Sequence, residues 1–181
     1  GLGQAERSRR GIARTFQINQ LFRGLTVLEN VVLAIAERQG IASAMFRPLS
    51  SYSEVTDEAM ELLSNFDLNE DALRRIDELP YGRQRLVEIV IALGQRPSVL
   101  LLDEPAAGIP SSESQHILDA ASALSSDITV LIIEHDMEIV FSVADYITVL
   151  VSGAVLTEGK PEVIAADERV RAVYLGEVDR A

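Results

Sequence analysis

The chain has 181 residues, the length of one domain or of one domain and part of another. Apolar residues make up 48% of it and charged residues 24%, as in soluble globular proteins, so collagenous and wholly disordered classes are excluded. Because there is no cysteine, a disulfide framework, a thiolate zinc site and a cysteine nucleophile are excluded as well. The net charge of −12 argues against a nucleic acid partner, because neutralising phosphates requires clustered Lys and Arg.

Residues 1 to 25 are more basic than the rest, with five arginines against one glutamate, a local charge of +4. Such a segment is more typical of a solvated face than of a binding patch, although a small anion site stays possible. It has no apolar core of the kind that a signal peptide needs. No run of about 18 uncharged apolar residues occurs in the sequence, so no segment is expected to insert into lipid directly.

The block from 26 to 97 has apolar residues at helical spacing. Thr26, with Glu29 at the capping-box position, predicts a helix through about Ala36. Residues 40–53 read as a loop. A second helix is indicated by apolar residues that share one face: Val55, Ala59, Leu62, Leu63 and Phe66. A third is predicted from Arg83 to Leu93, with Gly94 and Pro97 closing it.

From Ser98 onward, short apolar runs alternate with helices. The runs Val99–Leu102, Thr129–Ile133 and Tyr146–Val151 predict strands buried on both faces of a parallel sheet. Helices are expected over 112–124 and 137–143, and Ser152-Gly153 predicts a hairpin turn. The pattern of strand, helix and strand indicates the α/β class.

Two carboxylates, Asp103 and Glu104, follow the apolar run Val99–Leu102 directly. The carboxyl end of a parallel strand is where α/β folds bind ligands. The alternation of side chains along a strand points the two apart, so that one can bind Mg²⁺ and the other can activate water. The alternative is that acidic residues simply end the strand, and the pattern favours neither.

Three further patterns are weak when taken alone. His135 follows the next apolar strand and could donate a hydrogen bond to a phosphate, although a lone His is more often structural. Gly82 lies in the turn Pro80-Tyr81-Gly82 at a helix start, which is either a phosphate-binding element or an ordinary helix entry. Gln17, after Phe16, says nothing by itself.

Taken in order, these motifs resemble the nucleotide-binding subunits of ABC transporters, and among them those of branched-chain amino acid importers. The matching stretches cover nearly the whole chain from Gly11 to about Gly176: Arg14-Thr15-Phe16-Gln17 as the Q-loop, Leu79-Pro80-Tyr81-Gly82 as the signature motif, Leu102-Asp103-Glu104-Pro105 as Walker B, Ala106-Ala107-Gly108-Ile109 as the D-loop and Glu134-His135-Asp136 as the H-loop. The resemblance implies a partial P-loop NTPase-like ABC ATPase core, mostly a parallel sheet, with an inserted helical subdomain. It places the Q-loop in 1–25, the helical subdomain and signature in 26–97, and the C-terminal part of the catalytic core in 98–181.

The resemblance also implies roles. Gln17 would contact Mg²⁺ and the attacking water, and Asp103 would hold Mg²⁺. Glu104 would be the general base, and His135 would contact the γ-phosphate.

At the dimer interface that the resemblance implies, Tyr81, Gly82 and Arg83 would face the ATP of the opposite subunit in a head-to-tail dimer. That dimer would dock on two membrane subunits at the inner face of the cell membrane. The membrane subunits would insert a short helix between the helical subdomain and the core.

The sequence departs from the family pattern at several positions that matter for ATP binding and hydrolysis. The 181 residues contain no Gly-x-x-x-x-Gly-Lys-[Ser/Thr] phosphate loop, and the sole lysine, Lys160, is followed by Pro161. Arg83 replaces the usual signature Gln, and Pro110 stands in the D-loop.

From these departures we expect a fragment of an ATPase subunit that by itself is inactive, binds ATP poorly and self-associates through an open sheet edge. The alternative is a non-catalytic interaction or regulatory module with the same fold. An unrelated Mg²⁺-dependent phosphohydrolase leaves the Gln17 and signature matches unexplained.

Overall fold

The computed structural model describes residues 1, 3–15, 21–41, 52–109, 117–118, 121, 124 and 127–175. They form two compact units, Gly1–Ile133 and Glu134–Ala181. Both units combine helices with strands, and the first contains a parallel sheet, so the predicted α/β class is confirmed. Within these ranges, no helix is both long enough and apolar enough to cross a membrane.

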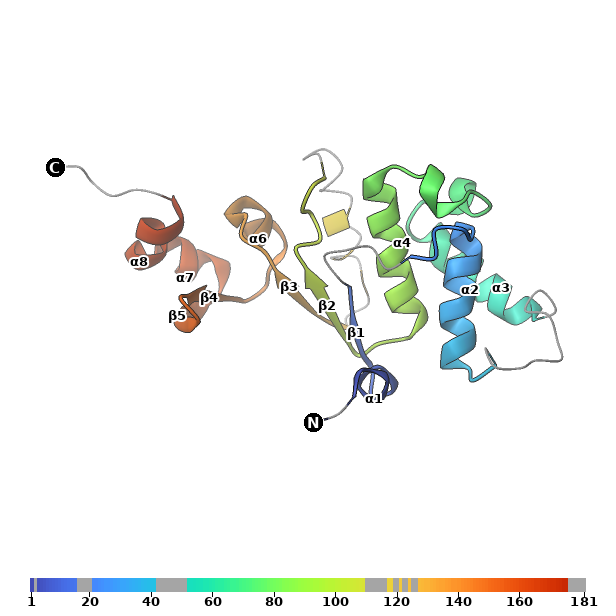
Figure 1. Ribbon diagram of the computed structural model, residues 1–181. Coiled ribbons are helices and arrows are strands. Elements are labelled where there is room, and N and C mark those ends of the chain that lie inside the picture. Colours follow the sequence, from blue (N-terminus) through green and yellow to red (C-terminus); the bar gives the residue numbers. More distant parts are fainter. Residues whose placement is uncertain are drawn as a thin grey trace. The chain divides into compact units, whose positions relative to one another are not determined.

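The sheet of the first unit has three parallel strands in the order β1 (Ile12–Arg14), β2 (Val99–Asp103) and β3 (Thr129–Ile133), as Figure 1 shows. β2 is the middle strand. Its Leu100 and Leu102 are almost fully buried. The chain enters β1 through Gly11 at φ +83°, where an added Cβ would lie 2.8 Å from Ser98 Oγ. Only glycine fits this close approach between the two strand entries.

The described residues of the first unit also form the helices α1 (Gln4–Arg9), α2 (Val27–Arg38), α3 (Ser53–Ser64) and α4 (Tyr81–Gly94). The predicted capping box is confirmed, because Thr26 Oγ1 accepts from the Glu29 amide and the Glu29 carboxylate accepts from the Thr26 amide. α4 begins two residues before the predicted Arg83. α2, α3 and α4 lie against one another, as Figure 1 indicates, and their inner faces form most of the main apolar core.

The segment between α3 and α4 contains two short 3₁₀ turns, η2 (Asn69–Asp71) and η3 (Ile76–Glu78). The start of α2 is held against it, because the amides of Val27 and Leu28 donate to the carbonyls of Arg74 and Ala72 at 3.0 and 2.9 Å. Amides at a helix start have no partner inside the helix. This segment therefore satisfies the α2 amides and leads directly into α4.

The second unit consists of α6 (Met137–Val143), the antiparallel hairpin β4 (Ile147–Val151) and β5 (Ala154–Gly159), α7 (Pro161–Ala166), α8 (Glu168–Val170) and the π-helical turn η4 (Arg171–Leu175). The predicted hairpin is confirmed, with Ser152 and Gly153 both at positive φ, as a type I′ turn requires. A small core gathers Ile147, Val149, Ile164 and Val170.

Two expectations about the strands were wrong. β4 was expected in the parallel sheet, but among the described residues it pairs only with β5, as the hairpin that follows it along the chain. β3 was expected to be buried on both faces, but Leu131 and Ile133 are 55% and 57% exposed. A continuous apolar run predicts a strand but does not show which strands lie beside it. The sequence therefore could not distinguish a central strand from an edge strand or from a strand of a hairpin. The predicted helix over 112–124 and most of the loop over 40–53 lie outside the described residues.

Candidate nucleotide and metal site

The strand β2 ends at the two predicted carboxylates. Asp103 is its last residue, and its side chain is 24% exposed. Asp103 Oδ2 accepts a hydrogen bond from Arg14 Nη2 at 3.0 Å, which is a contact that the sequence did not indicate. The two residues belong to neighbouring parallel strands.

Glu104 leaves the strand in a left-handed conformation with φ +44°. Its amide donates to the Ile133 carbonyl at 2.9 Å, and its carbonyl accepts from the Ala107 amide at 3.1 Å. Side chains other than glycine and asparagine seldom adopt this conformation, which is held here by hydrogen bonds on both sides. The backbone therefore changes direction between Asp103 and Glu104. This suits two carboxylates that are predicted to have different roles.

The signature residues form the start of α4. Pro80 precedes the helix, Tyr81 and Gly82 are its first two residues, and within the described part of the chain no side chain caps its first amides. Gln84 Nε2 donates to the Leu79 carbonyl at 2.9 Å, which holds the loop before the helix. A long helix whose first amides remain available attracts an anion, because the helix dipole is positive at this end.

Tyr81 connects the signature, to which it belongs, with the D-loop. Its ring is partly exposed and lies 5.6 Å from the guanidinium carbon of Arg85. On another side, Tyr81 Cε1 lies 3.8 Å from the place where a Cβ on Gly108 would be. The structure therefore brings together two predicted elements, the signature and the D-loop, that are 27 residues apart in the numbering of Tyr81 and Gly108.

The predicted signature residue Arg83 points to its own chain. Its Nε donates to Asp71 Oδ2, and its Nη2 donates to the Asp67 carbonyl. Asp71 is buried and also accepts from Arg74 Nη1 at 2.7 Å. Contact of Arg83 with a nucleotide stays a prediction, whereas its pairing with Asp71 is a feature of this structure.

The predicted His135 lies in the second unit, immediately before the start of α6. Its side chain is 75% exposed, and its Nδ1 lies 3.8 Å from Glu134 Oε2, while the Glu134 side chain is 2% exposed. The next residue, Asp136, caps α6 by accepting from the amides of Glu138 and Ile139. The residues on both sides of His135 thus make contacts of their own: Glu134 with His135, and Asp136 with the start of α6. The remaining predicted residue, Gln17, lies outside the described residues, as does Pro110.

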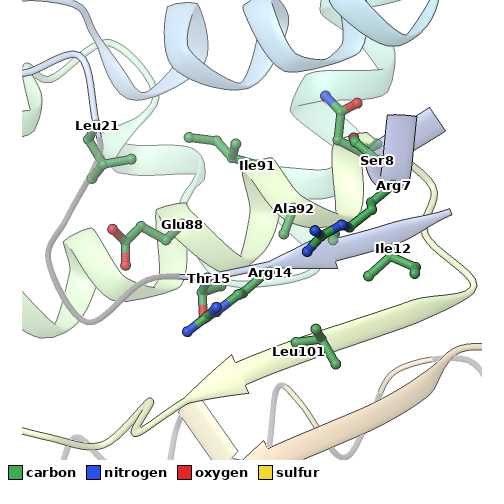
Figure 2. Close-up of a pocket in the computed structure, with 12 residues that line it drawn as sticks. Arg7, Ser8, Ile12, Arg14, Thr15, Leu21, Glu88, Ile91, Ala92 and Leu101 are labelled. Atoms are coloured by element: carbon green, nitrogen blue, oxygen red, sulfur yellow. The ribbon is translucent and has the colours of Figure 1, made fainter. Parts of the chain in front are cut away.

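A groove of about 600 Å³ runs along the free edge of β1 toward α1 and α4, as Figure 2 shows. Its lining is mixed: Arg7, Arg14 and Glu88 are charged, and Ile12, Leu21 and Ile91 are apolar. Sequence reasoning missed this groove. Its only trace in the sequence was the basic composition of residues 1 to 25.

Comparison with known proteins matches residues 3–107 to the family model described as "ABC transporter" and residues 154–180 to "Branched-chain amino acid ATP-binding cassette transporter". The high-affinity branched-chain amino acid transport ATP-binding protein LivG of Escherichia coli K12 is 37% identical over 186 residues, covering 98% of this chain and 72% of LivG. BraF of Pseudomonas aeruginosa, also a high-affinity branched-chain amino acid transport ATP-binding protein, is 37% identical over 184 residues, covering 98% of this chain and 72% of BraF. A crystal structure of the ADP conformation of an ATP-binding cassette of an ABC transporter superposes with a TM-score of 0.77 at 32% identity, covering 97% of this chain and 72% of that one.

The chain belongs to the ABC transporter family. Within it, the chain groups with the ATP-binding proteins of branched-chain amino acid transporters. Membership in this family of ATPase domains implies nucleotide binding, and one similar structure, 27% identical with a TM-score of 0.70, is a dimer bound to ADP and phosphate. The predicted family and fold are confirmed.

In this ABC-family chain, Asp103, Glu104, Tyr81 and Gly82 all lie in the first unit. The structure adds Arg14 as the partner of Asp103. Among the described residues, no group of three or more Asp, Glu, His or Cys side chains could hold a metal by itself. Asp103, at the end of β2 and partly exposed, offers carboxylate oxygens of the kind that Mg²⁺ prefers, and phosphate and water oxygens usually supply its other ligands.

Proposed function

We propose that the chain is part of the ATP-binding subunit of a branched-chain amino acid importer, in which ATP hydrolysis drives transport. The observation that carries the proposal is the pair Asp103 and Glu104 at the carboxyl end of β2, on a chain 37% identical to LivG and BraF. Bound Mg²⁺ and ATP supply the charge neutralisation and the phosphoryl group of the reaction.

In this proposal, one group of residues acts on the ATP and Mg²⁺ bound to the same subunit, and a second group contacts the ATP of the other subunit. Asp103 offers its carboxylate oxygens to Mg²⁺, and Glu104 takes a proton from the water that attacks the γ-phosphorus. Gln17 and His135 hold that water and the γ-phosphate oxygens, as the resemblance implies. Tyr81 and Gly82 present the start of α4 to the ATP of a second ATP-binding subunit in a head-to-tail dimer. Arg83 lies next to them, and its contact with that ATP remains part of the prediction.

The groove along β1 is the surface that we assign to the membrane subunit. It lies between α1, α4 and the sheet, and we propose that it receives the short helix that the family is expected to bind. Its apolar wall and charged rim suit an amphipathic helix. We therefore propose that the subunit works at the inner face of the cell membrane, held by the membrane subunits and without inserting into lipid itself.

The 181 residues alone contain no phosphate loop, so we expect them to bind ATP weakly and not to hydrolyse it. A chimera tests the proposal: the part of E. coli LivG that this chain does not cover is joined to these residues. We expect it to restore branched-chain amino acid uptake in cells that lack LivG. Glu104→Gln should abolish uptake, and Glu162→Gln, at an exposed site in α7, should leave it intact.

The alternative of a regulatory module predicts the opposite pattern. A chimera that is present at the membrane but gives no uptake, or whose uptake is unchanged by Glu104→Gln, contradicts an ATPase role for these residues. Immunoblotting of the membrane fraction separates loss of activity from loss of protein.

A further inference from the structure

The ion pair between Arg14 and Asp103 links two strands that are distant in sequence. β1 and β2 are parallel, with Arg14 opposite Leu101, so Arg14 and Asp103 lie on the same face of the sheet. Arg14 Nη2 reaches Asp103 Oδ2 at 3.0 Å. The pair is half-open to solvent, with the Arg14 side chain 52% and the Asp103 side chain 24% exposed.

The same carboxylate fits Mg²⁺. It offers hard oxygen donors, and it is partly exposed at the end of β2. A divalent cation at Asp103 Oδ2 would lie within a few ångströms of the guanidinium charge of Arg14, and two positive charges at that distance repel each other. The ion pair and the metal therefore compete for one carboxylate.

We propose that Arg14 is a positioning residue that holds Asp103 while no divalent cation is bound and that must leave it before Mg²⁺ binds. The proposal rests on the proposed role of Asp103 as the Mg²⁺ ligand. Asp103 then exchanges one cationic partner, Arg14, for another, Mg²⁺. The carboxylate at the end of β2 is therefore never left without a counter-charge.

Arg14 also lines the groove along β1. Its side chain therefore belongs to two sites at once, the metal carboxylate and the groove assigned to the membrane subunit. An acidic side chain entering the groove would attract Arg14 away from Asp103 and make the carboxylate available to Mg²⁺. This gives the docking surface a direct electrostatic connection to the metal site, through one residue three positions before Gln17.

Metal binding by the 181-residue chain tests the proposal without any measurement of hydrolysis. Mn²⁺, a paramagnetic substitute for Mg²⁺, is titrated while the broadening of the Asp103 and Glu104 amide resonances is followed by NMR, and Mg²⁺ is used to reverse it. We expect Arg14→Ala to tighten Mn²⁺ binding about fivefold or more, because the competing charge is removed. Arg14→Lys should stay near the wild-type value.

Arg7→Ala is the matched control. Arg7 lines the same groove and its loss removes the same charge, so it reports the general electrostatic effect alone. An increase of less than about twofold is expected for it at physiological salt. Equal effects of Arg7→Ala and Arg14→Ala, or no effect of Arg14→Ala, overturn the proposal. If Arg14→Ala disturbs resonances beyond β1, Arg14→Gln replaces it, because glutamine keeps a polar side chain and removes only the charge.

Asp103→Asn separates this proposal from the proposed function. If wild type and Asp103→Asn bind Mn²⁺ equally, Asp103 is no metal ligand and the assigned function of the site fails. If Asp103→Asn loses binding while Arg14→Ala matches Arg7→Ala, the metal site stands and only the role of Arg14 is refuted.

Discussion

Arg83 and Asp71 form an ion pair that ties the first turn of α4 to the segment between α3 and α4. The Asp71 side chain is only 7% exposed and also accepts from Arg74 Nη1. The guanidinium of Arg83 donates in addition to the Asp67 carbonyl. The family usually has a neutral glutamine at this position. In this chain an arginine stands there instead, and it holds the start of α4 to the segment between α3 and α4.

Removing the charge of Asp71 should destabilise the first unit strongly. Asp71→Asn leaves two guanidinium groups, 34% and 45% exposed, facing a neutral amide on a buried side chain, and losing hydrogen bonds to a charged group costs about 2 kcal/mol. Urea unfolding followed by circular dichroism measures the loss in the free energy of unfolding. Arg75→Gln is the control, because its pair with Asp77 is exposed on both sides and its loss should not be measurable. A change in Asp71→Asn no larger than that of the control would contradict a structural role for the cluster.

Local rules explain why part of the fold was predictable. The Thr26 and Glu29 capping box and the start of α6 depend on neighbours within four residues, and the sequence shows these directly. β2 and β3 were predicted within one residue because their apolar runs are short and sharply bounded. The order of the motifs was enough to indicate the family.

The contacts that matter most at the site were not predictable, because they join residues far apart in the chain. Nothing near Arg14 in the sequence indicates Asp103, which is 89 residues away, and nothing near Arg83 indicates the buried Asp71. The left-handed conformation of Glu104 depends on a hydrogen bond to β3. Each of these requires the strand register and the packing of the helices, which a pattern of apolar residues does not contain.

Glu58 should make stability depend on pH. It accepts two hydrogen bonds from Arg38, at 2.9 and 2.7 Å, and one from Arg96, and the Arg38 bonds above all hold the pKa of Glu58 below its ordinary value of 4.5. Since the pKa is lower in the folded state, the stabilisation is complete above about pH 4.5 and is lost as the pH falls through the folded-state pKa. The stability difference between wild type and Glu58→Gln should therefore be largest near neutral pH and should shrink in acid.

Urea unfolding of both proteins between neutral pH and pH 3 tests this expectation. Glu61→Gln, at an exposed site on the same helix, is the matched control, and its difference from wild type should vary much less. A Glu58→Gln difference that stays constant across the range would show that the ion pairs with Arg38 and Arg96 do not contribute to folding.

Gly108 should be required for the shape of the D-loop. Its φ is +74°, a region in which an alanine is strained by about 1 kcal/mol, although the added Cβ would meet Tyr81 only at an ordinary contact distance of 3.8 Å. Gly108→Ala should therefore lower the stability by that amount and shift the NMR resonances of the Tyr81 ring. Gly24→Ala is the control, because Gly24 is not at positive φ and its Cβ would meet nothing within 4 Å. Identical effects of the two substitutions would argue against a strained D-loop.

The edge of β3 should cause the chain to self-associate. Among the described strands β3 pairs with β2 alone, and it exposes Leu131 and Ile133 along one face. An unpaired apolar edge accepts a strand from another molecule, and a charged side chain placed there prevents this. We expect the weight-average mass in sedimentation velocity to rise with concentration, and Leu131→Lys to reduce this rise. Leu73→Lys serves as the control, because Leu73 is 79% exposed in the segment between η2 and η3 rather than on a strand. A chain that stays monomeric at every concentration, or an equal effect of both lysine variants, would show that the β3 edge does not drive association.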